Sequence, residues 1–125
     1  MKIETKDKSV IIDGVEYVEA GSVNTPAQNI DGMPYVLIRG KDAGCHAGYL
    51  KEKTATSVIL INDRRLWYWD GAATLSQLAV DGVSKRDKCK FPCEVSEVEI
   101  NNWCEVIMAT EKARLSIKGV PVWTE

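Results

Sequence analysis

The residues best suited to chemistry stand together in one stretch, RRLWYW at positions 64–69. Arginine binds phosphates and carboxylates through paired N–H groups, and tryptophan and tyrosine rings stack on nucleobases. Alternate side chains of an extended strand share a face. One face would carry Arg65, Trp67 and Trp69, and the other Arg64, Leu66 and Tyr68. The stretch therefore predicts a binding surface or a core strand with basic ends, and we expect at least one indole in the core.

The segment that follows, GAATLS at 71–76, would let an anion approach the backbone, because its side chains are small. Thr74 and Gln77 form a T-x-x-Q capping box, which predicts a helix start with free N–H groups that attract phosphate. Whether Thr74 only caps this helix or also helps to bind an anion stays open. The residues expected to contact a ligand are Arg64, Arg65, Trp67, Tyr68, Trp69, Gly71, Ala72, Thr74, Ser76 and His46.

Catalytic and metal-binding patterns are weak in this sequence. The one histidine, His46, lies in AGCHAGYL, and no potential nucleophile stands at a spacing typical of a catalytic pair. No phosphate-binding glycine motif occurs either. Cys89 and Cys93 have the spacing of half a zinc site, but no second close pair completes it. We therefore expect a protein that is not an enzyme, with no cofactor and no metal, whose cysteines pack as small hydrophobic side chains.

The elements that would position these residues are mostly strands. A hairpin at 9–19 around Asp13-Gly14 is expected, followed by a linker. Further expected strands are 34–39, 45–52, 53–62, 64–69 after an Asn62-Asp63 turn, and two runs within 95–108. Two short helices are expected, one from Thr74 to Gly82 and one from Thr110 to Gly119, on either side of a basic loop at 84–93. The pattern predicts an α+β protein, mostly β with two short helices, in which residues 1–32 form an N-terminal β-hairpin arm and residues 33–125 a small SH3-like meander β-barrel.

Composition narrows the classes of partner. The 125 residues include 16 basic and 18 acidic side chains, a net charge of −2, which argues against a protein that coats duplex DNA. A small anionic ligand needs only a few local cations and stays possible. No apolar run has the length of a membrane span and the N-terminus lacks the apolar region of a signal peptide, so we expect no membrane partner and a cytoplasmic location.

Three stretches carry a resemblance to a known family: AGCHAGYL at 43–50, RRLWYWDGAATLSQLAVDG at 64–82 and TEKARLSIKGVPVW at 110–123. They resemble a family of small bacteriophage proteins known only as a domain of unknown function, over most of the chain from Tyr35 to Trp123. Cys45 and Thr74 depart mildly from the family pattern. The resemblance implies a phage protein that acts in the cytoplasm of an infected bacterium, although it names no activity.

Two functions fit these features. The first is a non-enzymatic anti-defence protein, similar in kind to the phage sponges that sequester nucleotide second messengers from systems such as CBASS. Its ligand would be a cyclic oligonucleotide, for example cyclic GMP–AMP, and a two-fold symmetric ligand favours a homo-oligomer, a dimer or a tetramer. The alternative is a small barrel that binds a host protein or a single-stranded nucleic acid, which the basic residues Lys85, Arg86, Lys88 and Lys90 would assist.

Overall fold

The structure is a computed structural model that describes residues 3–6, 9–12, 15–18 and 25–125, with only the backbone described before residue 25. Its elements in chain order are β1 (Ile3–Lys6), β2 (Ser9–Ile12), β3 (Val15–Val18), β4 (Tyr35–Gly40), β5 (Cys45–Lys53), β6 (Ser57–Arg65), α2 (Leu75–Asp81), the 3-10 helix η1 (Arg86–Lys88), β7 (Val95–Asn101), β8 (Trp103–Met108) and α3 (Glu111–Lys118). The expectation of a mostly β protein with two helices is confirmed. No helix in the described part of the chain is long and apolar enough to cross a membrane.

The N-terminal strands form an antiparallel sheet in the order β1-β2-β3. The predicted hairpin is present as β2 and β3, in which Ser9 pairs with Val18 and Ile12 with Val15. The Asp13-Gly14 turn itself lies outside the described residues. The sequence pattern did not predict β1, because IETK contains only one large apolar residue and no alternating pattern.

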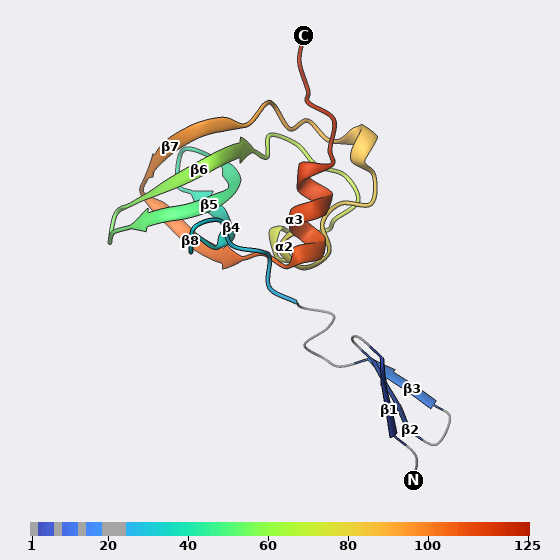
Figure 1. Ribbon diagram of the computed structural model, residues 1–125. Helices are drawn as coiled ribbons and strands as arrows, with labels where there is room; N and C mark the ends of the chain where they lie inside the picture. Colours follow the sequence, from blue (N-terminus) through green and yellow to red (C-terminus); the bar gives the residue numbers. More distant parts are fainter. Residues whose placement is uncertain (1–2, 7–8, 13–14, 19–24) are drawn as a thin grey trace.

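The remaining strands form one antiparallel sheet in the order β7-β6-β5-β4-β8, which curls beside the two helices (Figure 1). The expected meander of β4, β5 and β6 is confirmed, but the barrel is not. A barrel needs its two edge strands to pair, and here β7 pairs with β6 while β8 pairs with β4. The sheet is therefore an open, curled one.

A single residue, Asn102, carries the chain from one edge of this sheet to the other. Its φ of 59° lies in the left-handed region, which asparagine tolerates better than most residues. Its backbone N–H donates to the Thr56 carbonyl at 2.6 Å, and its carbonyl accepts from the Lys41 N–H at 2.9 Å. The two loops at this end of the sheet are thereby tied together, and the edge strands converge without pairing.

Strand β6 is continuous from Ser57 to Arg65, so the predicted turn at Asn62-Asp63 is wrong. Asn62 has a φ of 53°, and the register between β5 and β6 shifts between Ala47 and Tyr49, as at a β-bulge. The bulge breaks strict alternation. As a result the neighbours Asp63 and Arg64 are both buried, which the sequence pattern alone did not predict.

Both faces of the curled sheet are covered. The larger cluster lies between the sheet and the two helices and includes Leu37, Tyr49, Leu78, Phe91 and Ile117. The smaller one lies on the other face of the sheet and consists of Val36, Ile38, Val58, Leu60 and Ile100. Strand β4 contributes to both clusters, which explains its nearly unbroken apolar run.

The two helices begin as their capping residues predict. The Thr74 hydroxyl accepts from the Gln77 N–H at 3.1 Å, and the Thr110 hydroxyl accepts from the Ala113 N–H at 3.1 Å. Gly82 ends α2 with a φ of 74°. A side chain there would collide with Ser116 of α3, whose Cβ would be 2.3 Å from an added Cβ, so Gly82 also permits close helix packing.

Candidate ligand-binding surface

Two aromatic side chains stand exposed immediately beyond β6. Trp67 is 63% exposed and Tyr68 is 50% exposed, whereas their neighbour Leu66 is buried and Trp69 is half-buried against the larger core. The expectation that one indole packs in the core therefore fits Trp69. Neighbouring large rings are rarely left in water without a ligand or partner that covers them.

A lysine from a distant segment lies beside the Tyr68 ring. Tyr68 and Lys90 exchange backbone hydrogen bonds, from the Tyr68 N–H to the Lys90 carbonyl at 3.3 Å and back at 2.8 Å. The Lys90 Nζ lies 5.9 Å from the centre of the Tyr68 ring and 5.6 Å from that of Trp123, near the C-terminus. We call Tyr68, Lys90 and Trp123, together with Trp67, the exposed neighbour of Tyr68 in the chain, the aromatic–lysine surface. Sequence reasoning placed Lys90 in a basic loop but did not connect it, or Trp123, with the aromatic stretch.

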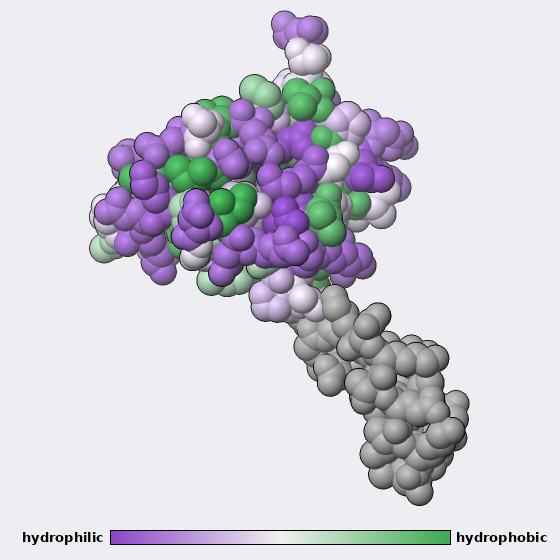
Figure 2. All heavy atoms as spheres, viewed as in Figure 1, coloured by the Kyte–Doolittle hydropathy of each residue, from purple (hydrophilic) through white to green (hydrophobic). Residues whose placement is uncertain are grey.

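The wider surface gives this group its context. On the face drawn in Figure 2, hydrophobic side chains reach the surface in separate patches among hydrophilic ones. Val122, which is 56% exposed, adjoins Trp123 in the chain and forms a backbone bridge with Phe91. Rings and an ammonium group on one surface are typical of sites that bind a planar, negatively charged ligand.

Arg64, expected to contact a ligand, is buried and satisfied inside the protein. Its Nε donates to the Pro92 carbonyl at 2.9 Å, its Nη1 to the Ile117 carbonyl at 2.7 Å and its Nη2 to the Phe91 carbonyl at 3.0 Å. Burial lowers the pKa of this guanidinium below its ordinary value, and Glu94 is the foremost of the groups that oppose the shift. Arg64 joins β6 to α3 and to the segment before β7, which is a structural role.

Arg65 is exposed and holds one described hydrogen bond, from Nη1 to the Ala43 carbonyl at 3.0 Å. That contact ties it to the loop between β4 and β5. Arg65 therefore differs from Arg64, whose guanidinium is buried. Of these two arginines, Arg65 is the one with donors left for a ligand, because its side chain is exposed and only one of its hydrogen bonds is described.

His46 is also buried, and both of its ring nitrogens have partners. Nδ1 lies 2.9 Å from Oδ2 of buried Asp63 and 3.0 Å from its Oδ1, and Nε2 lies 3.1 Å from the Ala43 carbonyl. The ring is thereby fixed between β5, β6 and the 41–44 loop, and it offers no free nitrogen to a ligand.

Side chains of the protein itself accept hydrogen bonds from the backbone N–H groups at the start of α2. In addition to the Thr74 cap, the N–H of Ala73, the residue before the cap, donates to Oε1 of Gln77 at 2.7 Å, whereas the reciprocal bond of a capping box would come from the Thr74 N–H. Two of the backbone donors at this end are therefore already used. Ala72 is half-buried, and Ala73, Thr74 and Ser76 are exposed. Ligand contact by Gly71, Ala72, Thr74 and Ser76 stays a prediction.

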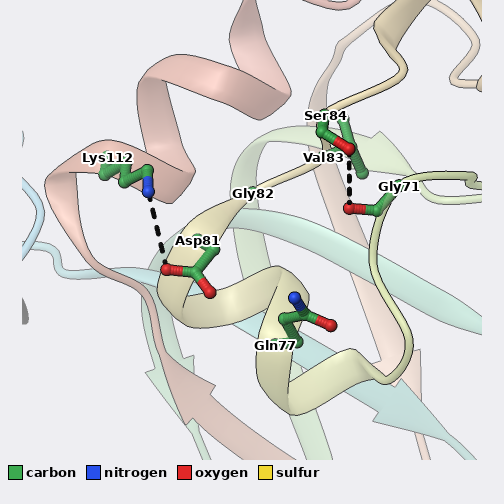
Figure 3. A pocket seen from close by; sticks show the side chains of 7 residues that line it. All are labelled: Gly71, Gln77, Asp81, Gly82, Val83, Ser84 and Lys112. Atoms are coloured by element: carbon green, nitrogen blue, oxygen red, sulfur yellow. Dashed lines mark hydrogen bonds and ion pairs between the residues drawn. The ribbon is translucent and has the colours of Figure 1, made fainter.

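A pocket of about 350 Å³ lies beside this helix (Figure 3). Its lining residues are Gly71, Gln77, Asp81, Gly82, Val83, Ser84 and Lys112. Lys112 lies across from Asp81, with Nζ 3.6 Å from Oδ1, and the Ser84 hydroxyl donates to the Gly71 carbonyl at 3.3 Å (Figure 3). A carboxylate on the wall, facing the cation, opposes the binding of a phosphate there.

The four cysteines are free thiols. Cys89 is buried, its thiol lies 3.4 Å from the Lys85 carbonyl and 3.6 Å from that of Asp70, and burial raises its pKa. Cys93 and Cys104 are exposed. Among the described residues, no group of three or more His, Cys, Asp or Glu side chains is placed to hold a metal ion.

Comparison with known proteins gives a family and no activity. The model of the family described as a domain of unknown function (DUF6948) matches residues 33–117, which is more than half of the chain. No curated protein and no solved structure matches the chain significantly. The matched range includes Trp67, Tyr68 and Lys90, while Trp123 lies beyond it.

Proposed function

We propose that this chain, which belongs to the DUF6948 family, is a non-enzymatic protein that binds a nucleotide ligand, first of all a cyclic oligonucleotide such as cyclic GMP–AMP. The observation that supports this proposal is the aromatic–lysine surface. Trp67 and Tyr68 project from the end of β6, half or more exposed, and the ammonium group of Lys90 lies beside the Tyr68 ring. Ring faces stack on any nucleobase, and an ammonium group pairs with phosphate.

Binding without chemistry is the mode of action we propose. His46 has partners at both ring nitrogens and lies in the interior, so it is poorly placed to serve as a general base for a bound ligand. A protein that holds a signal intact would act by lowering its free concentration. By the resemblance to small phage proteins, we propose that the signal belongs to a bacterial defence system such as CBASS, and that the protein acts in the cytoplasm of the infected host as an anti-defence sponge.

We also propose that the protein is a homo-oligomer, a dimer or a tetramer. A cyclic dinucleotide has two bases and two phosphates related by approximate two-fold symmetry, which a two-fold interface between identical subunits matches. The N-terminal sheet β1-β2-β3 lies outside the 33–117 family range and would serve as an oligomerisation arm. Analytical ultracentrifugation of the full chain and of a chain that begins at Thr25 tests this. A full chain that sediments as a monomer would contradict it.

The proposed ligand class is tested by a thermal-shift screen of the pure protein against cyclic dinucleotides, cyclic trinucleotides, cyclic mononucleotides and ADP-ribose signals. A ligand at 100 times its dissociation constant stabilises the fold by about 2.7 kcal/mol, which raises the melting temperature by several degrees. Mass spectrometry of the mixture then checks that the ligand is intact. Trp67→Ala should remove the shift, whereas Leu115→Ala, which truncates an exposed apolar side chain on α3, should leave it unchanged.

A second candidate, a single-stranded nucleic acid, is favoured by one observation. The exposed basic side chains Lys85, Arg86 and Lys88 precede Lys90, although Lys85 is paired with Asp70 at 3.7 Å. Polynucleotide binding releases counterions, so its affinity should fall steeply with salt, whereas the affinity for one small ligand should fall far less. A flat thermal-shift screen together with salt-sensitive binding of an oligonucleotide would replace the first candidate by the second.

A further inference from the structure

The C-terminal tail is bonded to the segment that carries Lys90. Val122 bridges Phe91 in parallel, and the Trp123 N–H donates to the Phe91 carbonyl at 2.9 Å. On the other side, Tyr68 pairs with Lys90 in antiparallel fashion. The segment at 90–91 therefore lies between Tyr68 and the tail, and backbone hydrogen bonds hold all three together. This arrangement places Trp123 in the surface even though it lies 55 residues from Tyr68 in the chain.

The lysine lies between two rings. Its ammonium nitrogen is 5.9 Å from the centre of the Tyr68 ring and 5.6 Å from the centre of the Trp123 ring, so the two centres are separated by no more than the sum of these distances. Both rings are half-exposed, at 50% and 42%. Within the described part of the chain, the Lys90 ammonium forms no hydrogen bond or ion pair, and its three N–H donors remain available to an anion.

We propose that Tyr68, Lys90 and Trp123 together recognise a dinucleotide unit, in which each ring stacks on one base and the ammonium group pairs with the phosphodiester that joins the two nucleotides. The inference rests on the proposed function and narrows its ligand. A planar base fits on each ring face, and a single charge between two rings matches the single charge between two linked bases. The unit is the same in a cyclic dinucleotide and in a single strand.

The two-ring geometry has a consequence for affinity. A mononucleotide engages one ring and the lysine, whereas a dinucleotide engages both rings. The second stacked base should strengthen binding by about tenfold to a hundredfold. Trp123 would then determine the size of the ligand, and it would do so from a tail that lies outside the 33–117 family range.

Isothermal titration of the full-length protein tests this with three ligands: AMP, linear ApA and cyclic di-AMP. The unmodified protein should bind at least one of the two dinucleotides tenfold or more tighter than AMP. Trp123→Ala should remove that preference and leave the AMP affinity within about threefold. Trp123→Phe should keep it, because a ring remains. Thr124→Ala is the matched control, since it changes an exposed neighbour in the same tail.

The outcomes separate the inference from the function on which it rests. Equal affinity for AMP and both dinucleotides, or an unchanged preference in Trp123→Ala, would overturn the dinucleotide unit and leave nucleotide binding intact. No binding of any of the three ligands, nor of an adenine 12-mer at low salt, would overturn both. A preference for cyclic di-AMP over ApA would identify a cyclic signal as the source of the unit, and a preference for the 12-mer that salt abolishes would identify a single strand.

Discussion

His46 and Asp63 form a buried pair, with Nδ1 of the imidazole 2.9 Å from Oδ2 of the carboxylate and with side chains only 1% and 3% exposed. The pair links β5 to the bulged part of β6, and Asp63 comes a few residues before Trp67 and Tyr68 in the sequence. Removal of one partner leaves the other buried without its hydrogen bond, which costs far more than an exposed pair contributes.

Asp63→Ala should therefore lower the free energy of unfolding by about 3–5 kcal/mol, as measured by urea denaturation. Glu97→Ala is the matched control, because it breaks an exposed pair with Lys51 at 3.1 Å and should cost no more than about 1 kcal/mol. If both variants lost the same small amount of stability, the His46–Asp63 pair would not have the structural role described above.

The two neighbouring arginines should behave differently. Arg64→Ala removes donors from three backbone carbonyls and should cost about 3 kcal/mol or more of stability. Arg65→Ala removes one exposed hydrogen bond and should change stability by less than about 1 kcal/mol, but it should weaken nucleotide binding. Chemical denaturation and isothermal titration of both variants separate these effects. A fully stable Arg64→Ala that no longer binds nucleotide would instead make Arg64 a ligand residue.

Gly71 holds the turn between the aromatic stretch and α2. Its φ of 90° disfavours other residues, and a Cβ there would lie 2.6 Å from the backbone nitrogens of Ser84 and Lys85. Gly71→Ala should therefore lower the free energy of unfolding by about 2–4 kcal/mol in total, because it adds both backbone strain and a steric clash. Gly44 is the matched control, since it has a similar φ of 76° but no atom within 4 Å of an added Cβ. In thermal denaturation, the melting temperature of Gly71→Ala should lie well below that of Gly44→Ala. Equal melting temperatures would refute the clash.

Tyr35 should make the protein sensitive to alkali. Burial, followed by the charge of Glu94 and the phenol of Tyr49, raises the pKa of the Tyr35 hydroxyl above its ordinary value of 10.0, while Arg64 and Arg114 oppose the shift. The folded state therefore holds this proton more tightly than the unfolded state. The stabilisation is complete below pH 10 and decreases as the pH rises further. Melting temperatures between pH 8 and 11 should fall more steeply for the unmodified protein than for Tyr35→Phe, and parallel curves would contradict this.

Local signals in the sequence were enough for most of the elements. The capping threonines Thr74 and Thr110 mark both helix starts, and the apolar runs mark strands β4 to β8, because caps and periodicity act over only a few residues. The bulge at Asn62 was not predicted, since an asparagine with positive φ reads equally well as a turn. The open sheet was not predicted either, because edge pairing depends on contacts between strands far apart in the chain.

The candidate surface was predictable only in part. The aromatic stretch in the sequence pointed to Trp67 and Tyr68 as candidate ligand residues. The burial of Arg64 was not predictable, because it depends on carbonyl groups at 91, 92 and 117 that lie far from Arg64 in the sequence. The positions of Lys90 and Trp123 depend in the same way on two isolated bridges between distant segments. A pattern along one strand does not contain this information.

The most direct test of nucleotide binding at the aromatic–lysine surface is a ¹⁵N–¹H spectrum of the indole N–H groups of the four tryptophans, recorded during titration with cyclic di-AMP. Tryptophan-to-phenylalanine variants assign the signals. We expect the signals of Trp67 and Trp123 to shift, and that of Trp103, whose Nε1 donates to the Thr54 carbonyl at 3.0 Å, to stay in place. A spectrum in which neither Trp67 nor Trp123 responds to a saturating ligand, or in which Trp103 alone responds, would contradict the proposed site.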